Sequence, residues 1–142
     1  MTDEVITFIC PAALTDQAPC PYAYAATTSA EQTGDTAGAC PLDADGQTVA
    51  VGEYVGQAQQ VMANLVTTLR EAGAELSDVV KSTVYVATSQ REDLNAVWDV
   101  VHATFAHHDA PRTLLGVSVL GWPDQLVEVE AVAVVAAPTS TH

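Results

Sequence analysis

Two strand-like runs in the last third of the chain constrain its fold and its chemistry more than any other feature. The first, residues 111–120, opens with Pro111 and Arg112, and the second, residues 126–135, carries Glu128 and Glu130 among apolar residues. A charged side chain in a core strand costs free energy unless it forms an ion pair or serves the protein's function, and the chain has only four Lys and Arg residues. If the protein has a catalytic site, we therefore expect it at these two strands.

The second run divides cleanly between two faces, because successive side chains of a strand point to opposite sides. The residues expected to face one way are Val127, Val129, Ala131 and Ala133, and those expected to face the other are Leu126, Val132, Val134 and the two glutamates.

Hydrophobic periodicity predicts the other elements. Apolar residues recur at three- and four-residue steps over residues 56–73 and from about residue 92 to 105, which indicates two amphipathic helices. Gly73 is well placed to end the first helix. Strands are predicted at residues 5–10, 22–28, 36–40 and 79–87, with turns over residues 29–35 and 42–47.

The predicted order is three strands, a helix, a strand, a helix and two strands. It indicates one α+β domain over residues 1–137, with two helices on one face of a mixed sheet and residues 138–142 as a tail. Since the strands are apolar on both sides, the second face also needs a cover. A homo-oligomer that packs sheet against sheet would provide it.

Charge and composition exclude several functions. The formal net charge of −14 disfavours binding to nucleic acid and to anionic membrane surfaces. No apolar run reaches the roughly 18 residues of a membrane-spanning helix, and the N-terminus lacks a basic signal-peptide region, so a cytoplasmic protein is expected. Cys10, Cys20 and Cys40 have neither disulfide nor zinc spacing and are expected to be reduced and structural.

The charged residues of the two strands allow two interpretations each. Glu128 and Glu130 either lie on a solvated sheet face or supply a general acid/base that positions water. Arg112 either pairs with a glutamate as a structural contact or binds a substrate carboxylate. The spacing of His102, His107 and His108 does not favour a metal site, and no nucleotide-binding motif is present, so no cofactor is expected.

An ordered set of motifs resembles the RidA/YjgF family of reactive-intermediate (enamine/imine) deaminases. The matching stretches are residues 36–41 (TAGACP), the helix over 57–73, residues 77–86 (SDVVKSTVYV), Pro111-Arg112 and residues 127–134 (VEVEAVAV). Together they cover roughly residues 22–135. Each motif is weak alone, whereas their order along the chain is specific.

The resemblance implies a chorismate-mutase-like α+β fold assembled as a homotrimer, with three clefts at the subunit interfaces. It implies that Arg112 binds the substrate carboxylate and that Glu128 positions or activates the water that attacks the imine carbon. Backbone groups near Gly38 and Leu114, and a tyrosine that is either Tyr22 or Tyr24, would line the cleft. The implied reaction needs no metal or cofactor.

The sequence departs from the family pattern around this implied cleft. A common serine is replaced by Ala37, a common cysteine by Leu114, and a pocket asparagine by Trp98. The loop before Arg112 is shorter, and the first 21 residues differ from the usual N-terminus. These changes keep the implied catalytic pair and make the pocket bulkier and more apolar, so Trp98 is included among the substrate-binding residues.

The sequence thus predicts a hydrolase that deaminates small reactive enamine or imine carboxylates to keto acids and ammonia. Two alternatives stay open. One is a non-catalytic module that binds a small carboxylate, and the other is a pathway-specific enzyme that hydrolyses, isomerises or cyclises a related imine. In each case the partners are a small carboxylate and further copies of the chain.

Overall fold

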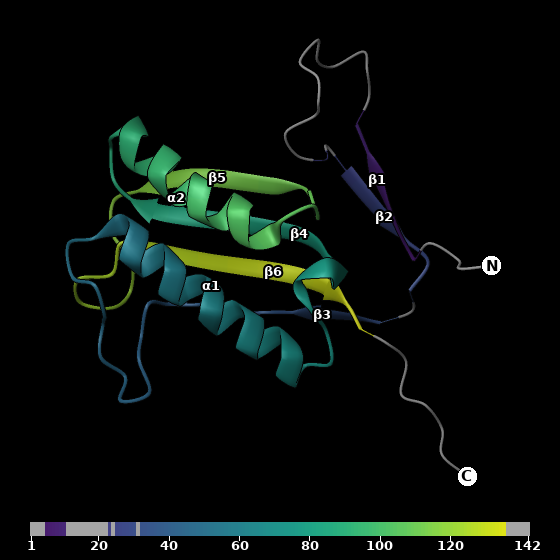
Figure 1. Cartoon of the computed structure of the whole chain (residues 1–142), viewed down its shortest axis with the longest axis horizontal. Helices are drawn as coiled ribbons and strands as arrows, with labels where there is room; N and C mark the ends of the chain where they lie inside the picture. Colours follow the sequence, from purple (N-terminus) through teal and green to yellow (C-terminus); the bar gives the residue numbers. More distant parts are fainter. Residues whose placement is uncertain (1–4, 11–22, 24, 31, 136–142) are drawn as a thin grey trace.

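A four-stranded mixed sheet forms the centre of the computed structural model, which describes residues 5–10, 23, 25–30 and 32–135. The strand order across the sheet is β3-β6-β4-β5 (Figure 1). The strands span Thr33–Asp35 (β3), Val79–Ala87 (β4), Arg112–Val117 (β5) and Val127–Val134 (β6). β4 and β5 are parallel, and β6 is antiparallel to both of its neighbours, so the mixed sheet predicted from the sequence is confirmed.

Both helices lie on the same face of this sheet (Figure 1). α1 spans Tyr54–Glu71 and α2 spans Arg91–Phe105, with a short 3-10 turn at Leu76–Asp78. The chain turns after α1 at Gly73, whose φ of 88° is a conformation that glycine adopts without strain. The predicted helices and their common sheet face are therefore confirmed.

The hydrophobic core lies between the helices and the sheet. It is built from the apolar stripes of the helices and from alternate residues of β4 and β6. The fully buried members from these elements include Val61, Met62, Leu65, Leu69, Val84, Val86, Val97, Val101, Val127 and Val129. From Val127 to Ala133 the residues of β6 alternate between buried and half-buried, as the two predicted faces of this strand require, and Val134 is buried as well.

A separate two-stranded sheet lies beyond one end of the main sheet. β1 (Ile6–Ile9) and β2 (Ala25–Thr28) pair antiparallel within the ranges predicted as strands (Figure 1). Phe8 packs against the core, with its ring centroid 4.9 Å from that of His108.

The segment before α1 corrects one prediction. Residues 29–35 were expected to form a turn and residues 36–40 a strand, whereas β3 is Thr33–Asp35 and residues 36–40 contribute only an isolated bridge. Gly34, interpreted as a turn residue, pairs with Ala133 within the edge strand. Residues 36–40 also lie beside β6, because Ala39 exchanges backbone hydrogen bonds with Val129.

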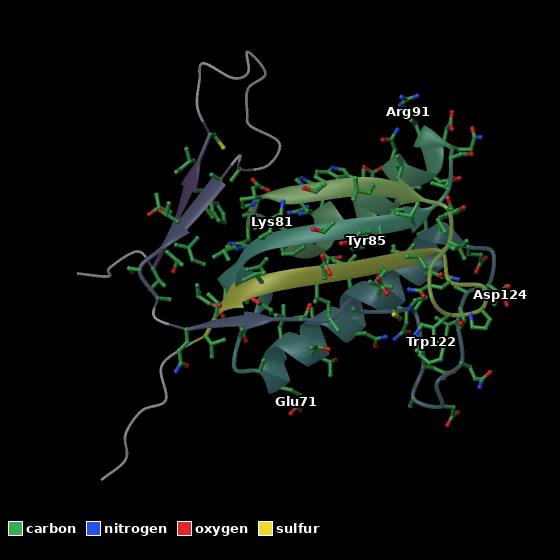
Figure 2. The ribbon with its side chains drawn as sticks, turned by 180° about the vertical axis from the view of Figure 1, so that it is seen from behind. Glu71, Lys81, Tyr85, Arg91, Trp122 and Asp124 are labelled. Atoms are coloured by element: carbon green, nitrogen blue, oxygen red, sulfur yellow. The ribbon has the colours of Figure 1, made fainter. Side chains whose placement is uncertain are left out.

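The sheet face opposite the helices is more polar than the sequence indicated. On β4 it presents Lys81 and Tyr85, visible in the view from behind (Figure 2). The Tyr85 hydroxyl donates to Glu130 Oε1 at 2.7 Å, and Lys81 Nζ donates to Thr113 Oγ1 at 2.9 Å. The expectation of strands that are apolar on both sides is therefore wrong for this face, which mixes charged, hydroxyl and apolar groups.

Within the part of the chain that the structure describes, no helix has both the length and the apolar character needed to cross a membrane.

A buried glutamine ties α1 to the loop that precedes β6. Gln57 is fully buried and donates from Nε2 to Asp124 O at 2.8 Å and, more weakly, to Ala50 O at 3.4 Å. Its Oε1 accepts from the Leu126 N–H at 2.7 Å. The helix thus fixes the point where the chain enters β6.

We expect Gln57→Ala to lower the free energy of unfolding by about 2–4 kcal/mol, because it leaves buried backbone groups without partners. Gln59→Ala is the matched control, since Gln59 is exposed on the same helix and should change stability by about 0.5 kcal/mol or less. Urea unfolding of both variants measures the difference. Equal stability of the two variants would contradict the assigned role of Gln57.

Candidate functional site

The side chain of Arg112 is buried against two aromatic rings of α2. It is the first residue of β5 and lies opposite Ser82 of β4. The side chain is only 5% exposed, and its Cζ lies 4.3 Å from the Phe105 ring centroid and 5.1 Å from that of Trp98. These contacts place the guanidinium on the helix side of the sheet, where cation–π attraction offsets part of its desolvation.

The guanidinium nevertheless has unused hydrogen-bonding capacity. Its Nε, Nη1 and Nη2 are all buried and make no hydrogen bond, and the buried Ser82 Oγ is also unpaired. Burial lowers the pKa of Arg112, and the Asp109 carboxylate opposes this shift. Since buried donors are nearly always satisfied, this group of orphaned polar atoms has the chemistry of an anion-binding site.

A pocket of about 510 Å³ opens beside Arg112. It is lined by Asn95, Trp98, Arg112, Thr113 and Leu114. The structure therefore brings together three of the residues predicted to bind substrate, namely Arg112, Trp98 and Leu114. The contribution of Phe105 was missed because it had been assigned only to the apolar stripe of α2.

Glu128 forms a second group of polar residues near the start of β6. Its Oε1 accepts a hydrogen bond from Cys40 Sγ at 3.2 Å and a longer one from Gln125 Nε2 at 3.4 Å. A Cβ added to Gly38 would clash with the Glu128 carboxylate in its present position, so the glycine lets this carboxylate lie directly against the backbone. Gly38 and Glu128, both predicted as site residues, thus lie together.

Cys40 is a protonated thiol at neutral pH. Burial raises its pKa to about 11, and the hydrogen bond and negative charge of Glu128 act in the same direction. Cys40 is not in a disulfide, and Cys20 lies outside the described residues. Sequence reasoning missed the contact of Cys40 with Glu128, although its position two residues after Gly38 was a usable signal.

Arg112 and Glu128 do not share a site within one chain. Arg112 faces the helices, whereas Glu128 shares the opposite face with Glu130 and Tyr85. Arg112 lies opposite Ser82 on β4, and Glu128 lies opposite Tyr85, three residues further along. Two strand spacings and this offset separate their Cα atoms by about 14 Å.

Several other residues singled out in the sequence have plain structural positions. Tyr22 and Tyr24 lie outside the described residues. His108 is hydrogen-bonded through Nε2 to Val79 O at 2.7 Å, and His102 stacks on Trp98. No cluster of three or more His, Cys, Asp or Glu side chains able to hold a metal ion occurs among the residues described.

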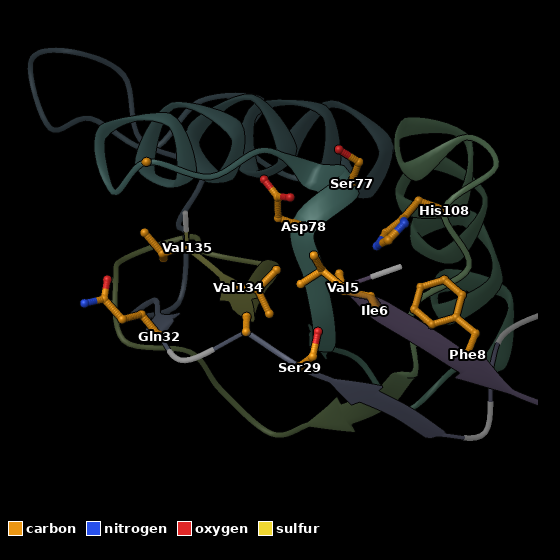
Figure 3. Close-up of a pocket in the computed structure, with 12 residues that line it drawn as sticks. Val5, Ile6, Phe8, Ser29, Gln32, Ser77, Asp78, His108, Val134 and Val135 are labelled. Atoms are coloured by element: carbon orange, nitrogen blue, oxygen red, sulfur yellow. The ribbon is translucent and has the colours of Figure 1, made fainter. Parts of the chain in front are cut away.

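A larger cavity, of about 620 Å³, lies between the β1-β2 hairpin and the end of the sheet (Figure 3). Its titratable side chains are already engaged, because His108 is bound to Val79 O and Asp78 accepts from the Glu75 N–H at 2.8 Å. The unpaired guanidinium of Arg112 therefore marks the smaller pocket as the better candidate for anion binding.

The chain matches a known protein family over most of its length. Residues 15–135 match the family described as Endoribonuclease L-PSP. A RutC family protein from Synechocystis is 37% identical over 123 residues, which cover 84% of this chain and 92% of that protein. A RutC family protein from Pyrococcus abyssi is 35% identical over 97 residues, covering 68% of this chain and 74% of that protein.

Solved structures agree with this match. The crystal structure of a Rid-family protein from Yersinia pestis superimposes with a TM-score of 0.85 at 31% identity, covering 93% of this chain and all of that one. The likeness includes the two helices and the mixed sheet that carry the site described above.

If Arg112 binds carboxylates, pyruvate should stabilise the protein by about 2.7 kcal/mol at a hundred times its Kd. We expect this stabilisation to disappear in Arg112→Met and to persist in Arg70→Met, since Arg70 is an exposed arginine on α1. Thermal unfolding with and without pyruvate measures the effect. A similar pyruvate-dependent shift in Arg112→Met would rule out Arg112 as the anchor.

Proposed function

The chain belongs to the Endoribonuclease L-PSP family, the RidA/YjgF family that its sequence resembles, and we propose that it deaminates small reactive enamine or imine carboxylates. The products are a keto acid and ammonia. The observation that carries this proposal is the buried guanidinium of Arg112 with three unpaired nitrogen atoms beside a pocket of molecular size.

Arg112 supplies the substrate anchor. The planar guanidinium can donate two parallel hydrogen bonds to a carboxylate, and burial strengthens this charge-assisted contact. Trp98 and Phe105 hold the guanidinium plane in place, so little side-chain freedom is lost when the carboxylate binds. The adjoining imine carbon is then held in a fixed position relative to the pocket wall.

Glu128 supplies the base. Its carboxylate accepts a proton from water as the water oxygen attacks the carbon of the protonated imine, giving a carbinolamine. That proton then passes to the amino group, and the carbon–nitrogen bond breaks while the Glu128 carboxylate takes the proton of the hydroxyl group, so that the carbonyl forms. The ammonia takes this last proton and leaves as ammonium, which returns Glu128 to its ionised form. One water is consumed for each ammonia released, and the pair of charged side chains completes the cycle without an external electron donor or acceptor.

The separation of Arg112 and Glu128 supports an active site shared between subunits. In one chain the two groups face opposite sides of the sheet, so an anchor and a base that act on one substrate must come from different copies. The face that carries Glu128 also presents the 43%-exposed Leu115. We place this face at the interface of a homotrimer, where Glu128 of one subunit meets the Arg112 pocket of its neighbour.

Ribonuclease activity, which the family description names, is not favoured for this chain. A net charge of −14 repels a polyanionic substrate over long range. The Arg112 pocket is lined by a tryptophan and a leucine and contains a single guanidinium. It suits one small carboxylate better than a run of phosphates.

Turnover should depend on both charged residues, and the two should act across an interface. Arg112→Ala and Glu128→Ala should each lose excess ammonia release from freshly generated 2-iminopropionate, by about a hundredfold or more. Mixed trimers refolded from equal amounts of the two variants should recover activity at about a quarter of their clefts, because those clefts combine both intact residues.

The uncatalysed hydrolysis of the imine is subtracted with a protein-free blank, and each variant refolded alone is the control for mixing. No recovery in verified mixed trimers would contradict the shared site. Full activity of Arg112→Ala would contradict the anchor. Saturable binding of pyruvate without turnover in the wild type would favour a carboxylate-binding module instead.

Trp98 should set the preference for substrate side chains. It lines the pocket where the family pattern has an asparagine, so imines with bulky apolar side chains should be preferred to 2-iminopropionate. We expect Trp98→Asn to move the ratio of kcat/KM toward 2-iminopropionate by about tenfold. Asp99→Asn is the control, since Asp99 is exposed on the same helix. An unchanged ratio in Trp98→Asn would contradict this role.

A further inference from the structure

The two oxygens of the Glu128 carboxylate have different hydrogen-bond partners. Oε1 accepts from the thiol of Cys40 at 3.2 Å and from the amide of Gln125 at 3.4 Å. The thiol also lies 3.5 Å from Gly38 O, so the carboxylate is its nearer acceptor. No hydrogen bond reaches Oε2 from any residue that the structure describes, and this oxygen lies close to the backbone of Gly38.

Gln125 is itself fixed in one orientation. It is 4% exposed, its Oε1 accepts from the Trp122 N–H at 3.0 Å, and its Nε2 donates to Val127 O at 3.1 Å. A flipped amide would place an NH₂ group against the Trp122 N–H, which is also a donor. The amide must therefore direct its donor toward the carboxylate.

Cys40 is fixed by the segment that runs beside β6. Its neighbour Ala39 exchanges backbone hydrogen bonds with Val129, and Asn64 of α1 donates to Cys40 O at 2.8 Å. Burial and the adjacent carboxylate keep the thiol protonated, so at neutral pH the sulfur donates a hydrogen bond and does not act as a nucleophile.

We propose that Cys40 and Gln125 are positioning residues, which hold Glu128 through Oε1 and leave Oε2 as the atom that takes the proton from water. This inference rests on the proposed function and adds residues to its site. Two donors from two different segments hold Oε1, and the missing side chain of Gly38 provides the room that the carboxylate occupies. The proton of the thiol stays on sulfur throughout the reaction.

The contact between Cys40 and Glu128 can be tested without any substrate. In a Cys10→Ser/Cys20→Ser background, Cys40 is the single thiol, and its rate of alkylation by iodoacetamide should rise only as the pH approaches about 11. In Glu128→Gln the midpoint should fall, because the carboxylate no longer raises the pKa of the thiol. Glu130→Gln is the matched control, since Glu130 is on the same strand face and bonds Tyr85.

The catalytic part is tested with the Cys40 variants. Cys40→Ala should lower kcat by about tenfold and leave KM within about twofold, because the base is misplaced while the anchor at Arg112 is intact. Cys40→Ser keeps a donor and should restore most of kcat. Thermal unfolding and oligomer size of both variants verify that the fold is retained, and a purely structural role would give no recovery with serine.

Two results would overturn the inference. One is an equal alkylation midpoint in the wild type and Glu128→Gln, and the other is full kcat in Cys40→Ala. If the wild type shows no turnover, the proposed function fails and the catalytic part of this inference fails with it. The alkylation experiment would still decide whether Cys40 donates its proton to Glu128.

Discussion

The alternation of side chains along β6 is the constraint on which the rest of this protein depends. One set of its residues forms part of the core beneath α1, and the other set carries Glu128 and Glu130 on the opposite face. A slip of one residue in register would bury two carboxylates and expose four apolar side chains. The burial of the apolar set therefore fixes the position of the acidic set, and packing energy orients the candidate base.

Much of this architecture could be predicted from the sequence because its signals are local. The periodic stripes of α1 and α2 and the β-branched run of β4 locate those elements within a few residues. β3 was missed because Gly34 is a common turn residue, and nothing local indicates that it pairs with Ala133. The polarity of the sheet face opposite the helices was missed because the prediction for β4 rested on its many valines. Lys81 and Tyr85 of the same strand lie on this opposite face.

The candidate site likewise contains residues that local sequence reveals and residues that it does not. Arg112 and Glu128 stand out as charged residues within apolar strands, so the sequence alone pointed to them, whereas Gly38 was indicated by the resemblance to the family. Cys40, Gln125 and Ser82 do not, since each matters through neighbours that are distant along the chain. That Arg112 and Glu128 face opposite sides follows only from the pairing of β4 with both β5 and β6. Strand register, which is a tertiary property, therefore decides how the residues can be combined.

The place of β6 between β3 and β4 also has a consequence for synthesis and folding. Both neighbours precede it in the chain, so during translation they emerge with unpaired edges and join one sheet only once residues 127–134 are available. Contacts of such long sequence separation form slowly and leave edges open to other nascent chains. A truncation before β6 would remove the middle of the sheet, and a chaperone that shields β4 would protect this protein most at that stage.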